Sequence, residues 1–111
     1  MSSDHDRLRD MADHLAKIAE HRPASVAELA GDELRSAAIV RWIEIVGEAA
    51  ANVSESTRDA HPELPWREII AMRNRLIHAY PDVNLDLVWG VVERDGPSLR
   101  SAIDAILEED S

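Results

Sequence analysis

The sequence predicts an all-α protein, an up-and-down bundle of four to five helices forming a single domain over residues 1–111. Apolar residues recur at spacings of three and four along most of the chain, which is the periodicity of amphipathic helices. Prolines, glycines and short polar residues fall at the ends of these stretches, where they stop or cap helices. No segment of the sequence shows the alternation of apolar and polar residues that is typical of a half-buried strand.

The first predicted helix has its apolar residues on one side. These residues are Leu8, Met11, Ala12, Leu15, Ile18 and Ala19. Asp4 or Asp6 can cap its start, and it should end near His21, ahead of Pro23. A short turn of helix or a loop is expected over residues 25–30, and Gly31-Asp32 then offers a stop and a new cap.

The second long helix is expected from about Glu33 to Val53. Its main apolar stripe consists of Ile39, Trp42, Ile43, Val46, Ala49, Ala50 and Val53. Leu34, Ala38 and Ile45 add apolar surface beside this stripe. A surface of this width can face two neighbours, as a bundle helix or a dimer interface requires.

The middle of the chain should contain a brief helical turn and then a third helix. Ser54 or Ser56 can cap the turn, which would run to Ala60. Pro62 and Pro65 each restrain the residue before them, so residues 61–65 should be irregular. Pro65 suits the first position of the third helix.

The third helix is predicted from Trp66 to about His78, ending there because Tyr80 precedes Pro81. We expect it to bury Ile69, Met72 and Leu76, with Ile70 and Ile77 as further candidates.

The last part of the chain should hold a fourth helix that Asn84 can cap. Gly96-Pro97 interrupts its apolar pattern. The stretch from Leu99 to Ile106 is therefore either a kinked continuation of this helix or a separate one.

The composition narrows the classes of function. The chain contains no cysteine, which excludes a disulfide framework, a thiolate metal site and a thiol nucleophile. Its charged start is followed by no unbroken apolar stretch, so we expect neither a signal peptide nor a membrane span, but a soluble, cytoplasmic protein.

The net charge of -10 argues against a general nucleic-acid surface, because phosphate binding usually leaves a basic footprint. The charge is unevenly distributed, however. Residues 65–81 carry three arginines against Glu68 alone, whereas residues 82–111 carry eight acids against two arginines. An anion site should therefore lie in residues 65–81. The acidic remainder could dock a basic protein partner or simply keep the surface soluble.

The stretch Arg73-Asn74-Arg75-Leu76-Ile77-His78-Ala79-Tyr80-Pro81 places a guanidinium, an imidazole and a phenol near one helix end. Five residues separate Arg73 from His78, which is a rise of about 7.5 Å and an offset of roughly 140° on an ideal helix. Histidine ionises near neutral pH and can move the proton of a ribose 2′-hydroxyl. Arginine can hold two phosphate oxygens and stabilise the charge that develops on the phosphorane. Together these groups could cleave RNA without a metal or another cofactor.

Simpler roles remain open for these residues on chemical grounds alone. Arg73 and Arg75 could be ordinary solvated helix residues, His78 a cap on the last carbonyls, and Tyr80 a packing residue. The other histidines lack the paired spacing and acidic third ligand of a zinc site, which favours surface or capping roles for His5, His14, His21 and His61. The three tryptophans lie on apolar stripes, which favours packing over base stacking for Trp42, Trp66 and Trp89.

Taken as a whole, the chain resembles the HepT-like toxins of the HEPN superfamily. Arg73 to His78 fits the R-x4-6-H signature of that superfamily, and the extension to Tyr80 fits the R-x4-H-x-Y form of HepT-like toxins. Four segments are similar to family segments in the same order. They are Glu44-Ile45-Val46-Gly47-Glu48-Ala49-Ala50, His61-Pro62-Glu63-Leu64-Pro65-Trp66, Met72-Arg73-Asn74-Arg75-Leu76-Ile77-His78 and Val88-Trp89.

The resemblance implies a two-fold homodimer that brings two copies of the motif into one cleft and cleaves RNA, either tRNA or mRNA. It implies Arg73 and His78 as the catalytic pair, beside which we expect Asn74 and Arg75 to contact the substrate. It also implies a small MNT-type nucleotidyltransferase as antitoxin, which binds the toxin and transfers AMP from ATP onto Tyr80. The added charge and bulk would repel RNA.

A second hypothesis belongs to a different functional class. The chain could be a non-catalytic interaction module that binds the nucleotidyltransferase and presents Tyr80 to it, which the acidic composition favours. Cleavage of RNA that depends on Arg73 and His78 distinguishes the two hypotheses.

Overall fold

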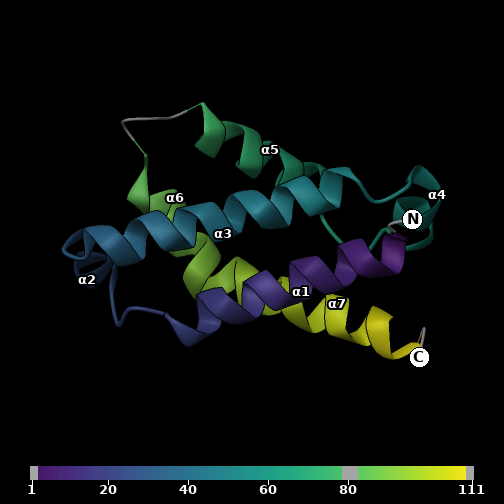
Figure 1. Ribbon diagram of the computed structural model, residues 1–111, viewed down its shortest axis with the longest axis horizontal. Helices are drawn as coiled ribbons and strands as arrows, with labels where there is room; N and C mark the ends of the chain where they lie inside the picture. The colour runs from purple at the N-terminus through teal and green to yellow at the C-terminus, as the bar shows by residue number, and fades with distance from the viewer. Residues whose placement is uncertain (1–2, 79–82, 110–111) are drawn as a thin grey trace.

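The structure is a computed structural model that describes residues 3–78 and 83–109. In these residues every regular element is helical and no strand occurs (Figure 1). The elements are α1 (Asp4–Glu20), α2 (Val26–Ala30), α3 (Glu33–Ala51), α4 (Glu55–Ala60), α5 (Trp66–Ile77), α6 (Leu85–Gly90), the π-helical segment η1 (Val91–Asp95) and α7 (Gly96–Glu109). The predicted all-α fold is confirmed.

The body of the protein consists of the four longest helices, α1, α3, α5 and α7. Helices α1 and α3 lie against each other at the centre, while α5 packs on α3 and α7 packs on α1 (Figure 1). The short helices α2 and α6 lie together at one end of the body, and α4 lies at the other end. Helix α5 therefore takes its position mainly from α3.

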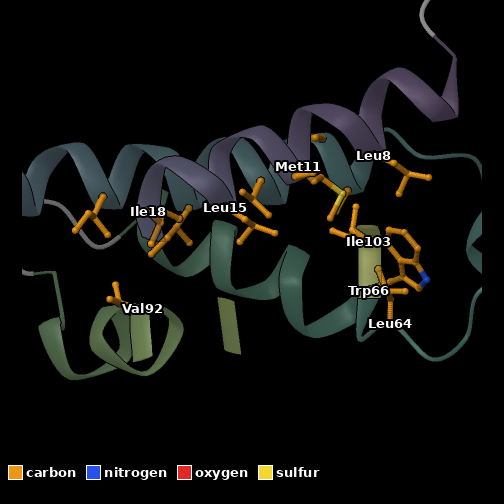
Figure 2. Packing of buried hydrophobic residues seen from close by; sticks show 14 of the residues in the cluster. Leu8, Met11, Leu15, Ile18, Leu64, Trp66, Val92 and Ile103 are labelled. Carbon is orange, nitrogen blue, oxygen red and sulfur yellow. The ribbon is translucent and has the colours of Figure 1, made fainter. Parts of the chain in front are cut away.

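The core forms where the apolar stripes of these helices meet. Figure 2 shows Leu8, Met11, Leu15 and Ile18 projecting from one side of α1 into the interior, as the sequence predicts. Ile39 of α3 and Ile103 of α7 are completely buried there. Each such side chain stabilises the fold by roughly 1.5–3 kcal/mol through removal of apolar surface from water.

The α4 end of the core is closed by Leu64 and Trp66, which are both buried (Figure 2). The indole N–H of Trp66 donates a hydrogen bond to the backbone oxygen of His61 at 2.9 Å. This bond satisfies the only polar atom of the ring and anchors the irregular segment before α5. The packing role predicted for Trp66 is confirmed.

The start of α1 differs from the prediction. Ser3 is the N-cap, and its hydroxyl accepts a hydrogen bond from the Asp6 N–H, while the Asp6 carboxylate accepts from the Ser3 N–H. Asp4 instead accepts hydrogen bonds from the backbone and hydroxyl of Ser54 and from the hydroxyl of Thr57, at the N-terminus of α4. It thus joins the start of α1 to a helix fifty residues away.

The caps predicted at Asp32, Ser54 and Asn84 are confirmed, because each accepts a backbone N–H at the start of α3, α4 and α6. Ser25, for which no cap was predicted, does the same at the start of α2. Pro65 is the N-cap of α5 and not its first residue, and it offers no side-chain hydrogen bond.

Gly96 and Pro97 do not end the helix. The backbone stays helical from Leu85 to Glu109, so the continuation is correct and the separate helix is wrong. The Gly96 N–H bonds to the Val91 carbonyl five residues back, which is the π pattern and gives the chain room for a proline without an N–H. A Cβ on Gly96 would lie 2.7 Å from this carbonyl oxygen, so the π turn requires glycine at this position.

Two further expectations concern apolar residues. Ile77, a candidate for burial in α5, is 44% exposed, because it points about 100° around the helix from its buried neighbour Leu76. No helix within residues 3–78 and 83–109 combines the length and apolar character needed to cross a bilayer.

Candidate functional site on helix α5

The candidate residues lie on the second half of α5 and at its end. Arg73, Asn74 and Arg75 belong to the helix, and His78 is its C-cap, with an N–H that donates to the Asn74 carbonyl at 3.2 Å. The predicted order of a guanidinium followed by an imidazole at the helix end is present. Tyr80, the predicted site of AMPylation, lies outside the described residues.

Arg73 lies where α5 crosses α3. A Cβ built on Gly47 of α3 would be only 2.2 Å from the Arg73 Cβ and 2.8 Å from its Cγ, so the two helices approach closely at this point. The Nε of Arg73 is buried and has no hydrogen-bond partner among the described residues. The Arg73 side chain as a whole is half-buried, and a guanidinium can hold an anion through its other N–H groups.

His78, Asn74 and Arg75 are exposed on the outer end of the helix. The position of His78 as C-cap keeps it close to the ideal helical path, so the expected rise of about 7.5 Å from Arg73 holds approximately. Arg73 is thus held at its root by α3, while the other three residues project from the surface.

Two hollows in the described part of the chain lie elsewhere. The larger, of about 360 Å³, is an apolar trough between α5 and α7 with α1 and α3 as its floor, and its polar lining includes Glu63, Glu68 and Asp95. The smaller, of about 290 Å³, lies between α1 and α7 and is lined by Arg22 and Arg100 among others. Arg73 and His78 line neither of these two hollows; Arg73 is half-buried and His78 is exposed.

The remaining histidines have local partners. The Nδ1 atoms of His14 and His21 each lie 2.8 Å from the backbone oxygen four residues earlier, and His61 lies 3.2 Å from Glu63. These contacts fit the surface and capping roles predicted for these three. Over the described ranges, no three metal-ligating side chains come close enough to hold an ion.

Two tryptophans lie on the surface of the bundle close to basic groups. The Trp42 ring is 5.1 Å from the ring of His21, and the guanidinium of Arg22 lies 5.8 Å from the centre of the Trp89 ring. Both tryptophans are half-buried and pack against the core, as predicted from their apolar stripes.

Gly47 is the residue whose role the sequence prediction missed. It was noted only as part of a family segment, although a glycine inside a helix is unfavourable and usually has a packing reason. The signal was therefore present, but the residue that it faces could not be identified without the tertiary structure.

Comparisons with known proteins agree on one family. Residues 11–106 match the family model described as "Ribonuclease HepT-like". A "Probable ribonuclease HepT" of Thermococcus cleftensis is 36% identical over 102 residues, which cover 91% of this chain and 93% of that protein. A "Putative RNase" of Caldanaerobacter subterraneus subsp. tengcongensis is 35% identical over 86 residues, covering 78% and 77%. No solved structure matches the chain.

The family model covers most of the chain, including every described residue of α5, and the first of these relatives aligns over nearly its whole length. The chain therefore belongs to the HepT-like ribonuclease family, within the HEPN superfamily.

Proposed function

We propose that this protein is a metal-independent RNA endonuclease and the toxin of a toxin–antitoxin pair. The observation that carries the proposal is Arg73, whose Nε is buried without a described partner one and a half turns before an exposed histidine. A half-buried arginine that has no ion pair among the described residues can bind a phosphate without first breaking one. The family and the names of its relatives support RNA as the substrate.

In the proposed reaction Arg73 binds the scissile phosphate and stabilises the charge that develops on it. A neutral His78 takes the proton of the ribose 2′-hydroxyl, and the 2′-oxygen attacks the adjacent phosphorus. The bond from phosphorus to the 5′-oxygen breaks, and a protonated histidine supplies that oxygen with a proton. The products are a 2′,3′-cyclic phosphate and a 5′-hydroxyl.

One imidazole cannot be base and acid in the same step, so the reaction favours a second copy of the motif. We propose a two-fold homodimer in which the second copy of His78 protonates the leaving oxygen. The exposed end of α5 supports this arrangement, because Ile77 offers 44% of its surface to solvent beside His78. Asn74 and Arg75, both exposed, are proposed to contact the RNA backbone on either side.

The proposed regulator is an MNT-type nucleotidyltransferase that binds the toxin and transfers AMP from ATP to Tyr80, releasing pyrophosphate. The phenol lies two residues after His78 in the sequence, so the modification would add negative charge beside the histidine. The net charge of -10 supports a basic docking surface on this partner.

The decisive experiment uses the purified chain with RNA in the presence of EDTA. We expect cleavage that leaves 2′,3′-cyclic ends, and His78→Ala should lower kcat by about 10³-fold through loss of acid–base catalysis. His21→Ala is the matched control, since His21 is also an exposed helix C-cap but lies outside the motif. Cleavage that survives in His78→Ala, or that appears only with added metal, would contradict the proposal.

The second candidate, a non-catalytic module that binds the nucleotidyltransferase, is favoured by one observation. Asn74, Arg75 and His78 are exposed, and neither they nor Arg73 line either of the two hollows. This candidate predicts that the chain forms a complex with the nucleotidyltransferase but does not cleave RNA. Mass spectrometry of Tyr80 after co-expression tests the partner and the modification separately from cleavage.

A further inference from the structure

Gly47 stands in the middle of α3 among strong helix formers, with Glu48, Ala49 and Ala50 directly after it. Glycine weakens a helix interior relative to alanine, so its presence needs a reason in the packing. The reason lies across the helix pair: an added Cβ would meet the Arg73 Cβ at 2.2 Å, its Cγ at 2.8 Å and the Ile69 carbonyl oxygen at 3.2 Å. These atoms belong to the backbone and the root of a side chain, which cannot rotate away.

The other helical glycines do not share this constraint. A Cβ on Gly90 would meet only the terminal nitrogen of Arg94 at 3.4 Å, the far end of a flexible side chain. A Cβ on Gly96 would meet the Val91 carbonyl oxygen, but this atom belongs to the η1 segment and not to α5. Gly47 is thus the glycine, among those of the described residues, that determines how closely α5 approaches α3.

The close approach has a direct effect on Arg73. To reach a carbon–carbon contact of roughly 3.5 Å from 2.2 Å, the two helices would separate by about 1.3 Å at this point. Because α5 packs mainly on α3, the separation would loosen the principal packing of α5. The separation would expose the buried Nε of Arg73 and move its guanidinium away from the phosphate position.

We propose that Gly47 is a positioning residue for Arg73: it lets α3 hold the root of this side chain so that the guanidinium is preorganised for a phosphate. The inference rests on the proposed nuclease function for its consequence in catalysis, but the packing itself does not depend on that function. A misplacement of about 1 Å can reduce catalysis by about 10²-fold. The expected loss is in kcat, because the charge that Arg73 stabilises develops in the transition state.

The first test measures the packing without any RNA, as a double-mutant cycle of thermal unfolding with G47A and R73G. We expect G47A to lower the Tm by several degrees when Arg73 is present, and clearly less in the R73G background, where the facing Cβ is gone. Should G47A alone fail to fold, a folded G47A/R73G double variant supports the proposal and an unfolded one overturns it. G90A is the matched control and should leave the Tm unchanged or slightly raised.

The second test measures kcat and KM of RNA cleavage at a temperature at which all variants are folded. G47A should lower kcat by about 10²-fold with little change in KM, and adding it to R73A should cost almost nothing further, because the two residues act as one unit. A purely structural role predicts instead that G47A costs as much in R73A as in the parent, which would overturn the proposal. If the parent cleaves no RNA, the nuclease function fails, while the thermal cycle still decides whether Gly47 holds Arg73.

Discussion

The side of the molecule formed by α1, α3 and α7 differs from the end of α5 in how its residues are held. On the first side, fully buried side chains such as Ile39 and Ile103 fill the interior, and Asp4 ties two helix starts together. At the C-terminal end of α5, in contrast, Asn74, Arg75, Ile77 and His78 are exposed.

The residues that stabilise the fold and the residues proposed for catalysis therefore lie in different regions. Burial of apolar surface supplies most of the folding free energy, and it is concentrated in the α1–α3–α7 side. The end of α5 contributes little burial and leaves its polar groups open to ligands. Gly47 lies where the two regions meet, because this residue of α3 packs directly against the Cβ of Arg73 on α5. Substitutions in the two regions should therefore affect different measurements.

The largest effect on folding is expected from Ile39→Ala, which removes a completely buried side chain from α3. The lost burial and the cavity left behind should lower the free energy of unfolding by about 3 kcal/mol. Urea denaturation measures this value. At a temperature at which the variant is folded, kcat should stay close to that of the parent. A large drop in kcat there would contradict the conclusion that this region contributes to stability and not to catalysis.

Gly96→Ala should have the next largest effect. The new Cβ would lie 2.7 Å from the Val91 carbonyl oxygen, so η1 has to rearrange around it. We expect a loss of about 2 kcal/mol, in the range of overpacked sites. Gly90→Ala, whose new Cβ would meet only the end of the flexible Arg94 side chain at 3.4 Å, is the control and should be neutral or slightly stabilising. Equal Tm values for these two variants would contradict the role assigned to the π segment.

Asp4→Asn should cost about 1 kcal/mol at neutral pH, since hydrogen bonds to a partly exposed carboxylate are weaker than buried ones. The hydroxyl of Ser54, then that of Thr57 and the Ser54 N–H lower the pKa of Asp4 below its ordinary value of 3.8. The folded protein therefore binds this proton less readily than the unfolded chain does. The stabilisation is fully present above pH 3.8 and is lost as the pH falls through the lowered pKa.

Thermal melts between neutral and acidic pH measure this contribution. The difference in Tm between the parent and Asp4→Asn should shrink as the pH falls below 3.8. Asp13→Asn, on the exposed side of α1, is the control and should follow the parent at every pH. A difference that stays constant down to the acid transition would rule out this account of Asp4.

The smallest effect on folding is expected from Ile77→Ala, at most about 0.5 kcal/mol, because this side chain is already 44% exposed. Its neighbour Leu76 is 4% exposed, so Leu76→Ala should cost several times more. Chemical denaturation of the two variants compares adjacent residues of one helix. In the proposed homodimer Ile77→Ala should instead weaken association, which sedimentation at several concentrations measures.

Most helix limits followed from the sequence because they depend on local interactions. A proline restrains the residue before it, a serine or aspartate accepts a nearby N–H, and an apolar spacing of three and four marks one side of a helix. The caps at Asp32, Ser54 and Asn84 were therefore predicted correctly. The order of Arg73 and His78 along the helix was also fixed locally, although their catalytic roles stay a prediction.

Other features depended on contacts between distant residues, and these only the tertiary structure decided. Asp4 could have capped its own helix, but Ser54 and Thr57 reach it from fifty residues away. Gly96-Pro97 would break an isolated helix, yet the chain stays helical because a π turn accommodates it. Gly47 could be seen as an unfavourable helix residue in the sequence, but only the packing of α5 on α3 shows that it faces Arg73. Sequence patterns report what a residue does to its neighbours along the chain, whereas the position of a guanidinium depends on which helix lies against it.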